Sequence, residues 1–513
     1  MDNLNLDMFK AYDIRTKQSK LTDEITDRLI DAVVVYCKNI LQVENVIIGR
    51  DARLYVPALA ERAAEKLTDA GIDVFLNPLP VSTCQFYYTC LQNPSYAGLM
   101  FTASHNPGEY VGIKFMAQNL VPLAMGNGPE GGFAKIKDFY INGEKPVKAA
   151  VKGRVHIINY LESYIDYCMK LSGVKPDSLK GLKIFLEFLS GSAGAELALA
   201  FQKAGADVTV RNVIPNGFFP SGDPNPIIES SIAPARKVIE EGDFDLGFCF
   251  DGDGDRMDIM DRDGKQIVPG LNMAIIIPQI MKIYGGTKKH FYADVKAIPS
   301  SLAQIAKSGA KIHIIRNGHS FIKAKLRTNC ENGYFASEEE SAHYYMNFPL
   351  DINDFSKGYG AVELTLFFAL LTARCYKTDP SAYERAKAIQ DSIFRKREWP
   401  LYCEAAPEKM PVLMQQVEDR MRELGASVIS TMDDGSDLDA TLMRFNLPEQ
   451  IDNTTDLSSV KWCQVAQRIS RSEDAMCRWE VVSNDESLCE FYNNEIIKIT
   501  DPFVSHGFAR YGE

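Results

Sequence analysis

Apolar strands, helical segments and glycines alternate along the chain in a pattern that occurs three times. The first copy has an apolar run at 46–50, a helical segment at 59–69 and a second apolar run at 70–76. Two further copies with the same order lie within 182–210 and 291–314. Each copy has a glycine where its helix would end in a left-handed cap, at Gly71, Gly205 and Gly309.

Strand–helix–strand units of this kind favour right-handed crossovers in mostly parallel sheets that are covered by helices. We therefore predict three α/β domains in series, with mixed and mostly parallel sheets. From about residue 398 the pattern changes to separate strands such as 440–445 and 479–482, which predict a smaller α+β domain. The expected domains, set around a central cleft, are 1–156, 157–265, 266–397 and 398–513.

Residues 102–107, Thr-Ala-Ser-His-Asn-Pro, predict a turn that presents the hydroxyl of Ser104. Pro107 lacks a backbone donor and biases Asn106 away from the helical region. The apolar run at 96–101 just upstream suits a buried strand. Serine turns are common, so this motif alone also fits an ordinary loop.

A second motif, Asp-Gly-Asp-Gly-Asp-Arg at 251–256, predicts a site for a divalent cation. Carboxylates at alternate positions can bring their oxygens together on one hard cation, and without it they repel. The alternatives are an acidic turn and an EF-hand loop. The EF-hand pattern fails because Arg256 and Arg262 stand where glycine and glutamate are needed. Arg256 adds a positive fork that suits phosphate.

With these motifs the sequence resembles the α-D-phosphohexomutase family, in its phosphomannomutase/phosphoglucomutase branch. The resemblance covers nearly the whole chain and keeps the family order. The matching segments are 9–15, 102–107, 112–114, 251–256, 294–296, 318–323 and 339–343.

The chain departs from the family pattern at several positions. Val111 stands where asparagine is usual, Glu338 where glycine is usual, and Asn317 where an apolar residue is commoner. The C-terminal phosphate loop at 468–478 has one extra residue and has Asp474 in place of proline.

The resemblance implies a mutase that interconverts hexose 1-phosphate and hexose 6-phosphate, for mannose, glucose or both. It implies a phosphoserine at Ser104, a bisphosphorylated sugar intermediate, and glucose 1,6-bisphosphate or mannose 1,6-bisphosphate as activator. Mg²⁺ would be held by Ser104, Asp251, Asp253 and Asp255. The other implied catalytic groups are Lys114, Arg256, His319 and His343, and either histidine or Lys114 could be the general acid or base. The implied substrate-binding residues are Arg15, Lys296, Glu339, Ser341, Arg468, Ser470, Arg471, Ser472 and Arg478.

Composition narrows the class of protein. A net charge of −12 over 513 residues argues against a general nucleic-acid or anionic-membrane surface. The first residues lack the basic and apolar stretches of a signal peptide, and the most apolar runs are too short or interrupted to span a bilayer. Eleven cysteines without a C-x-x-C pair fit reduced thiols. We expect a cytoplasmic enzyme, monomeric or homodimeric, whose partner is a small sugar phosphate.

Two other functional classes stay open at this point. One is a sister mutase that acts on glucosamine or N-acetylglucosamine phosphate, a question that Glu340 does not settle. The other is a catalytically silent sugar-phosphate-binding protein, which the irregular C-terminal loop makes conceivable. Ser104 and the three aspartates argue against silence, because a protein that only binds needs neither.

Overall fold

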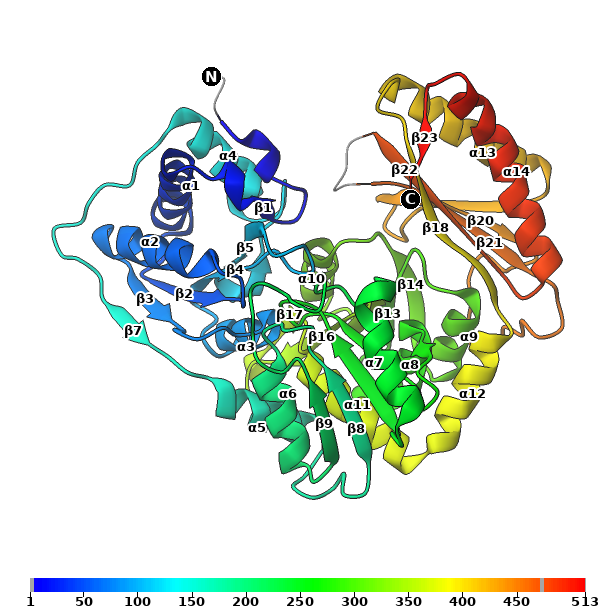
Figure 1. Ribbon diagram of the computed structural model, residues 1–513, viewed down its shortest axis with the longest axis horizontal. Helices are drawn as coiled ribbons and strands as arrows, with labels where there is room; N and C mark the ends of the chain where they lie inside the picture. The colour runs from blue at the N-terminus through cyan, green and yellow to red at the C-terminus, as the bar shows by residue number, and fades with distance from the viewer. Residues whose placement is uncertain (1–3, 471–474, 513) are drawn as a thin grey trace. The chain divides into compact units, whose positions relative to one another are not determined.

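The structure is a computed structural model that describes residues 4–470 and 475–512. Its chain divides into two compact units, and each is described by itself (Figure 1). The first unit comprises Met1–Ile267, Gly318–Glu331 and Ser341–Thr378. The second comprises Val268–Asn317, Asn332–Glu340 and Asp379–Glu513.

The first sheet of the first unit contains the strand that leads to Ser104. Its strands, in spatial order, are β1 (Ile14–Lys17), β5 (Tyr110–Ala117), β4 (Ala97–Phe101), β2 (Asn45–Arg50), β3 (Asp73–Leu76) and β7 (Val155–Ile157), with β6 (Val121–Pro122) paired to β5. Strand β2 is parallel to β3 and β4, whereas β4 is antiparallel to β5. The sheet is therefore mixed, as predicted.

Helices cover both faces of this sheet. They are α1 (Asp23–Val35), α2 (Val56–Asp69), α3 (Thr83–Gln92) and α4 (Phe133–Asn142). Val46 and Ile48 of β2 belong to the core that α1, α2 and α4 share. The next residue, Gly49, faces Phe86 of α3 instead, because successive strand residues point to opposite faces.

A second sheet in the first unit carries the aspartate motif. Its strand order is β12 (Gln266–Ile267), β11 (Met257–Met260), β10 (Leu246–Phe250), β8 (Lys183–Glu187) and β9 (Asp207–Arg211). Its helices are α5 (Leu161–Ser172), α6 (Gly194–Lys203) and α7 (Glu229–Glu241). Strand β8 is parallel to β9 and β10, and β10 is antiparallel to β11. Residues 251–256 form the connection between β10 and β11.

The remaining elements of the first unit supply histidines to the site. They are α10 (His319–Thr328), β16 (His343–Pro349), β17 (Tyr359–Val362) and α11 (Thr365–Thr378). Strands β16 and β17 are antiparallel, and every residue of β16 is buried. The backbone at His343 also forms a bridge with Arg256, which brings this hairpin against the aspartate loop.

The second unit begins with another strand–helix–strand region. It contains α8 (Pro269–Ile283), β13 (His290–Asp294), α9 (Pro299–Lys307), β14 (Lys311–Ile315), β15 (Tyr334–Glu339) and α12 (Pro380–Asp391). Strand β13 lies between β14 and β15 and is parallel to both. Asp294 and Glu339 thus both end their strands at the same edge.

The C-terminal region is an antiparallel sheet with two long helices on one face (Figure 1). The strand order is β19 (Ser427–Thr431), β20 (Asp437–Phe445), β21 (Cys463–Ile469), β22 (Met476–Ser483), β18 (Phe394–Tyr402) and β23 (Arg510–Tyr511). Helices α13 (Met410–Glu423) and α14 (Glu486–Ser505) complete its core, in which Trp479 is fully buried.

The three repeated units are confirmed. Gly71, Gly205 and Gly309 follow their helices with φ of +82°, +80° and +101°, so each helix ends in the predicted left-handed residue. The predicted α/β class with mixed sheets is likewise confirmed, while the domain boundaries at 156, 265 and 397 stay predictions. Among the described residues, no helix combines the length and apolar character needed to cross a membrane.

Candidate active site

Ser104 lies in a tight, buried turn at the carboxyl end of β4. Its backbone has a φ of +52°, a left-handed conformation that a non-glycine residue adopts only when its surroundings hold it there. The Thr102 hydroxyl accepts a hydrogen bond from the Ser104 N–H at 2.9 Å. The Ser104 side chain is 4 % exposed, and its Oγ lies 3.2 Å from Nδ1 of His105.

Arg53 stabilises this turn through an ion pair and several hydrogen bonds. This arginine and Asp51 are both completely buried and form an ion pair of 3.0 Å. The Arg53 guanidinium also donates to four backbone carbonyls, those of Ser104, Asn106, Pro107 and Tyr110. A planar cation with five fixed N–H donors can hold several carbonyls at once, so it determines the shape of the serine turn.

The aspartate loop packs directly against the serine turn. Ser104 Oγ donates to Oδ2 of Asp251 at 3.2 Å. A Cβ atom at Gly252 would lie 2.8 Å from the Ser104 carbonyl oxygen, so only glycine permits this approach. Gly254 has a φ of +73°, which favours glycine for a different reason. The two glycines therefore allow the loop to reach the serine turn.

The three aspartates fit a divalent cation. One carboxylate oxygen from each lies within 4.8 Å of the others, and all three side chains are buried. Oδ1 of Asp253 is buried without a hydrogen-bond partner among the described residues. Burial, together with Asp255 and Asp253, raises the pKa of Asp251 to about 8. A proton or a metal ion is thus needed to make the cluster stable, and oxygen ligands suit Mg²⁺.

Three cationic side chains surround the cluster. Lys114 Nζ donates to Oδ2 of Asp253 at 2.7 Å and also bonds to Asp255. Burial opposes its charge, but the two carboxylates hold the pKa of Lys114 well above its usual value. Arg256 Nε lies 4.0 Å from Asp251 Oδ2 and its backbone N–H donates to Asp251 Oδ1 at 3.2 Å, while the Arg15 side chain donates to Asn106 of the serine turn at 2.6 Å.

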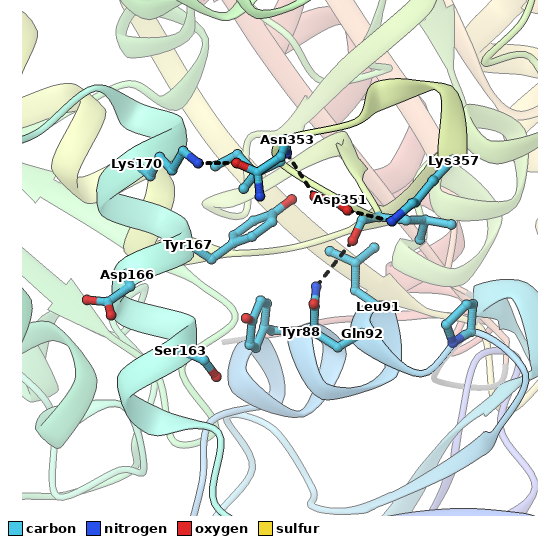
Figure 2. A pocket seen from close by; sticks show the side chains of 13 residues that line it. Tyr88, Leu91, Gln92, Ser163, Asp166, Tyr167, Lys170, Asp351, Asn353 and Lys357 are labelled. Atoms are coloured by element: carbon cyan, nitrogen blue, oxygen red, sulfur yellow. Dashed lines mark hydrogen bonds and ion pairs between the residues drawn. The ribbon is translucent and has the colours of Figure 1, made fainter.

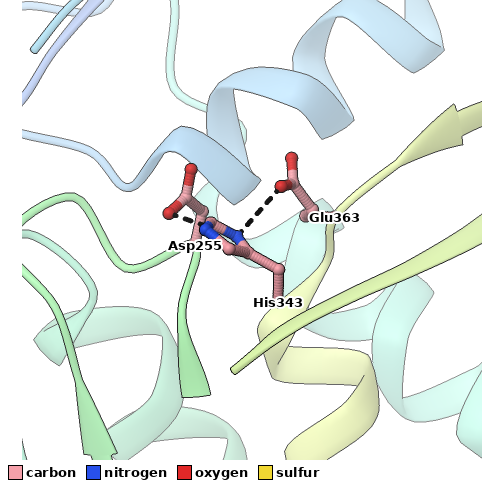
Figure 3. Close-up of side chains that lie close together, drawn as sticks. All are labelled: Asp255, His343 and Glu363. Atoms are coloured by element: carbon pink, nitrogen blue, oxygen red, sulfur yellow. Dashed lines mark ion pairs between the residues drawn. The ribbon is translucent and has the colours of Figure 1, made fainter. Parts of the chain in front are cut away.

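His343 is held between two carboxylates (Figure 3). Its Nδ1 lies 3.1 Å from Oε1 of Glu363 and 3.7 Å from Oδ1 of Asp255. Its Nε2 lies 3.2 Å from Arg256 Nε, which has a proton to donate. Nε2 is therefore the acceptor, and Nδ1 carries the ring proton toward Glu363. Burial disfavours the charged ring, yet Asp255 and Glu363 raise the pKa of His343.

Glu363 is itself anchored. Its Oε2 accepts from Lys323 Nζ at 2.7 Å, and Lys323 also donates to the Tyr87 hydroxyl at 2.8 Å. Burial raises the pKa of Glu363, but Lys323 and His343 outweigh it and lower the value to about 2. The acid therefore stays ionised and fixes the histidine tautomer.

His319 begins α10 and packs edge-on against Tyr12 at 5.9 Å. Burial, reinforced by nearby cations including Lys323 and Lys114, holds the pKa of His319 well below its usual value. This histidine is neutral over the physiological range. Ser341 lies on the chain just before Ala342, whose carbonyl accepts from the Met257 N–H at 2.9 Å.

Helix α3 supports the aspartate loop from the side. The Thr83 hydroxyl donates to Oδ2 of Asp253 at 2.6 Å, and the preceding Ser82 caps the helix by accepting from the Gln85 N–H. Ser82 in turn donates to Oε1 of Glu196 at 2.5 Å. Burial raises the pKa of Glu196 to about 8.

Glu196→Gln is expected to flatten the pH dependence of stability. Because the folded pKa lies above that of the unfolded chain, neutral Glu196 stabilises the fold at low pH, and this contribution is lost as pH rises from about 4 to 8. Calorimetric melting from pH 5 to 9 should show the wild-type temperature falling more steeply than that of the variant. Glu61→Gln on the exposed surface is the matched control. Parallel curves for wild type and Glu196→Gln would contradict the argument.

The far end of α3 lines a separate cavity of about 660 Å³ (Figure 2). Tyr88 and Gln92 from α3 face Tyr167 and Lys170 from α5 across it, with Asp351 on a third side. Lys357 pairs with Asp351 at 2.7 Å, and the Gln92 amide donates to the Leu350 carbonyl at 3.5 Å. Of the two lysines in the lining, Lys357 is thus paired with an acid, while Lys170 donates to the Asn353 side chain.

In the second unit, Asp294 anchors the loop that follows β15. Its Oδ2 accepts from the Glu340 N–H at 3.2 Å, and its Oδ1 accepts from the Lys296 N–H at 3.3 Å. The Glu340 side chain is bonded by Arg395 at 3.2 Å, and Arg395 also pairs with Glu480. Glu339, a predicted sugar ligand, ends β15 within this framework.

The predicted phosphate arginines lie opposite each other on adjacent strands. Arg468 on β21 and Arg478 on β22 form a cross-strand pair. Both donate to Glu398 of β18, Arg468 through two nitrogens and Arg478 through one. Ser470, whose N–H donates to the Met476 carbonyl, closes the strand pair. Arg471 and Ser472 lie outside the described residues. So do Glu473 and Asp474, two acids that would pair with the arginines if the loop were an ordinary solvated loop.

Several residues of the site were not predicted from sequence: Asp51, Arg53, Thr83, Glu363 and Glu398. Glu363 left a visible signal, since it is a single acid inside the apolar stretch that joins β17 to α11. The Asp51–Arg53 pair also stands directly after a buried strand. Thr83 and Glu398 leave no local signal, because their roles depend on contacts distant in sequence.

Comparison with known proteins matches this geometry. Residues 6–125 match the family model for phosphoglucomutase/phosphomannomutase, alpha/beta/alpha domain I, and residues 162–264 match that for domain II. A phosphomannomutase from Salmonella montevideo is 29% identical over 352 residues, covering 67% of this chain and 74% of the relative. A phosphoglucomutase from Neisseria meningitidis is 28% identical over 349 residues, covering 67% and 71%.

The fold is also shared with a solved structure. A phosphoglucomutase/phosphomannomutase family protein from Burkholderia thailandensis aligns with a TM-score of 0.75 at 18% identity, over 97% of this chain and 98% of that one. Both family models belong to the phosphoglucomutase/phosphomannomutase family and the curated relatives carry the same two names, so the comparisons agree with the resemblance of the chain to the α-D-phosphohexomutase family.

Proposed function

We propose that the chain is a phosphohexomutase that interconverts hexose 1-phosphate and hexose 6-phosphate, with mannose, glucose or both as the sugar. The observation that carries this proposal is the position of Ser104 Oγ, 3.2 Å from Asp251 in a buried site with two more aspartates and Lys114. Phosphoryl transfer depends mainly on positioning and charge neutralisation, which these groups supply. The curated relatives named above support the mutase class.

Asp251, Asp253, Asp255 and Ser104 are the residues that would hold Mg²⁺. Their ligand atoms are oxygens, which this cation prefers, and the three carboxylates converge in a buried place. When bound, the ion would neutralise negative charge on the phosphoryl group in transit. A phosphorylated Ser104 carries a charge of roughly −1.5 to −2 near pH 7, which Lys114, Arg256 and Arg15 would balance further.

The reaction is two phosphoryl transfers in opposite senses. In the first, the bond between phosphorus and Ser104 Oγ breaks and a bond to a sugar hydroxyl oxygen forms. The hydroxyl proton passes to a base, and Ser104 Oγ takes up a proton. The bisphosphorylated sugar then turns round, and Ser104 Oγ gives its proton to a base as it attacks the other phosphate. The bond from that phosphorus to the sugar oxygen breaks, and the sugar oxygen takes up a proton. The phosphoserine is restored.

His343 is the group best suited to move these protons. Its Nδ1 lies 3.1 Å from Glu363, so Nε2 is the basic nitrogen, and it could take a proton once its hydrogen bond from Arg256 is released. The raised pKa of His343 would let it return that proton as an acid. Lys114 is a poorer base because its two aspartates hold the ammonium form. His319 is a poorer acid because its pKa is well below the usual value.

The rest of the substrate would be bound by the other residues that the family resemblance implies. Glu339 and Ser341 would bond the sugar hydroxyls in both orientations. Lys296, with the loop residues Arg468, Ser470, Arg471, Ser472 and Arg478, would hold the non-reacting phosphate. Glucose 1,6-bisphosphate or mannose 1,6-bisphosphate would serve as activator by phosphorylating Ser104.

The direct test is turnover of mannose, glucose and glucosamine 1-phosphates in parallel, with Mg²⁺ and glucose 1,6-bisphosphate present. We expect conversion of mannose 1-phosphate, glucose 1-phosphate or both, each at least about ten-fold better in kcat/KM than glucosamine 1-phosphate. Preference for glucosamine 1-phosphate would move the chain to the sister mutases. Binding of all three sugars without turnover would mean that the protein is a silent sugar-phosphate-binding protein.

Asp253→Asn is expected to lower kcat/KM by about 10²-fold or more, because it keeps the size of the side chain and removes one metal-ligand charge. A chelator should abolish wild-type activity, and added Mg²⁺ should restore it. Asp263→Asn, an exposed carboxylate in the next turn, is the matched control and should retain activity. Activity that ignored both the chelator and Asp253→Asn would reduce the aspartates to an acidic turn.

A further inference from the structure

Strand β18 contains a bulge next to the two phosphate arginines. Its register against β22 pairs Lys396 with Val481 and then Trp399 with Trp479. Two residues of β18, Arg397 and Glu398, therefore lie opposite a single residue of β22, Glu480. A bulge of this kind turns the extra residue out of the regular alternation and redirects its side chain. The carboxylate of Glu398 is thereby directed to the arginine pair.

The contacts of Glu398 join the two arginines. Arg468 bonds both carboxylate oxygens, through Nε to Oε1 and through Nη2 to Oε2 at 2.7 Å. Arg478 donates from Nη1 to the same Oε2 at 3.2 Å. The parallel arrangement with Arg468 is the bidentate geometry that fixes the plane of a guanidinium. Glu398 does not use all five N–H donors of either arginine, so it can orient them while a phosphate is bound.

Charge explains why an acid is needed at this position. Lys296, Arg468 and Arg478 all act on Glu398, and although burial raises its pKa, these cations lower it to about 2. The carboxylate is therefore always ionised. Without it, Arg468 would keep only the more indirect influence of Asp294 and Glu480, and the repulsion between the cations would rise in a site that is only 16–26 % exposed at the two arginines.

We propose that Glu398 is a positioning residue for the distal phosphate, holding Arg468 and Arg478 side by side so that both can bond one phosphate group. This inference rests on the proposed function, in which the two arginines hold the non-reacting phosphate. It adds to that function a residue outside the loop itself. The role follows from the bulge, the shared carboxylate oxygen and the cross-strand pairing of the arginines.

Glu398→Gln tests the proposal, because it retains the shape and one acceptor oxygen but removes the charge. We expect KM for the sugar 1-phosphate to rise about ten-fold with kcat within about two-fold, since an interaction common to substrate and transition state is weakened. Glu398→Asp, which retains the charge, should recover part of the loss. Glu404→Gln is the matched control, because Glu404 pairs with Arg510 on the exposed surface of the same region.

Calorimetric titration with glucose 6-phosphate provides a readout that does not depend on turnover. Wild type and Glu404→Gln should bind alike, and Glu398→Gln should remain folded but bind about ten-fold more weakly. Unchanged or tighter binding by folded Glu398→Gln would overturn the proposal, as would a loss of kcat alone. If the wild type bound glucose 6-phosphate but turned over no sugar phosphate, the mutase function would fail. The binding comparison would still decide the role of Glu398.

Discussion

Ser104→Ala is expected to lose at least about 10³-fold in mutase turnover while keeping a folded structure. The loss follows because Ser104 is the proposed carrier of the phosphoryl group, and nucleophile substitutions typically have effects of this size or larger. The fold should persist because the side chain makes few contacts and alanine is no more strained than serine at a φ of +52°.

Two measurements check this prediction. A coupled assay gives the turnover, and intact-mass analysis should show partial addition of one phosphate to the wild type and none to Ser104→Ala. The control is Ser172→Ala, a buried serine whose hydroxyl only bonds the Met169 carbonyl within its own helix. Full turnover by Ser104→Ala, or phosphate found on another residue, would remove the phosphoserine from the mechanism.

Arg53→Met is expected to be the most damaging change to stability near the site. It removes one partner of a completely buried ion pair and leaves Asp51 as an uncompensated charge, a loss that usually costs about 3–5 kcal/mol. Four carbonyls of the serine turn also lose their donor. We expect turnover to fall with stability, because the turn then no longer holds Ser104 in its left-handed conformation.

Scanning calorimetry, in which the lowest transition is compared, is the appropriate measurement because the chain has more than one unit. Arg50→Met is the matched control: its guanidinium also donates to a carbonyl, that of Pro78 at 2.7 Å, but on the partly exposed surface. The double change Asp51→Asn with Arg53→Met should recover part of the stability, since it removes the orphaned charge. A single Arg53→Met variant that melted like the wild type would contradict the role assigned to this pair.

The parts of the site that could be predicted from sequence are those whose chemistry lies in one short segment. Ser104 and the aspartates at 251, 253 and 255 are recognisable because spacing alone brings their oxygens together, and both loops follow apolar runs. Gly71 is predictable for a similar reason, since a helix followed by glycine and an apolar run defines a cap.

The unpredicted parts depend on contacts between distant segments. Glu363 meets His343 across a strand pair, and Thr83 reaches Asp253 over 170 positions of sequence. Glu398 is the clearest case. The direction of its side chain comes from a bulge in β18, and neither the composition nor the hydrophobic periodicity of the sequence indicates that bulge. The sequence predicted Arg468 and Arg478 as phosphate ligands but did not indicate the partner that lies 70 positions upstream of Arg468.

Helix α3 offers a way to observe the aspartate loop by spectroscopy. Thr83 at one end bonds Asp253, and Gln92 at the other end is exposed beside the cavity in Figure 2, roughly 14 Å away along a rigid helix. Of the eleven cysteines, only Cys375 is not fully buried. A fluorophore on Gln92→Cys, in a chain carrying Cys375→Ser, would therefore be a single-site label. Its emission would follow cation binding and serine phosphorylation in real time, without any modification of the site itself.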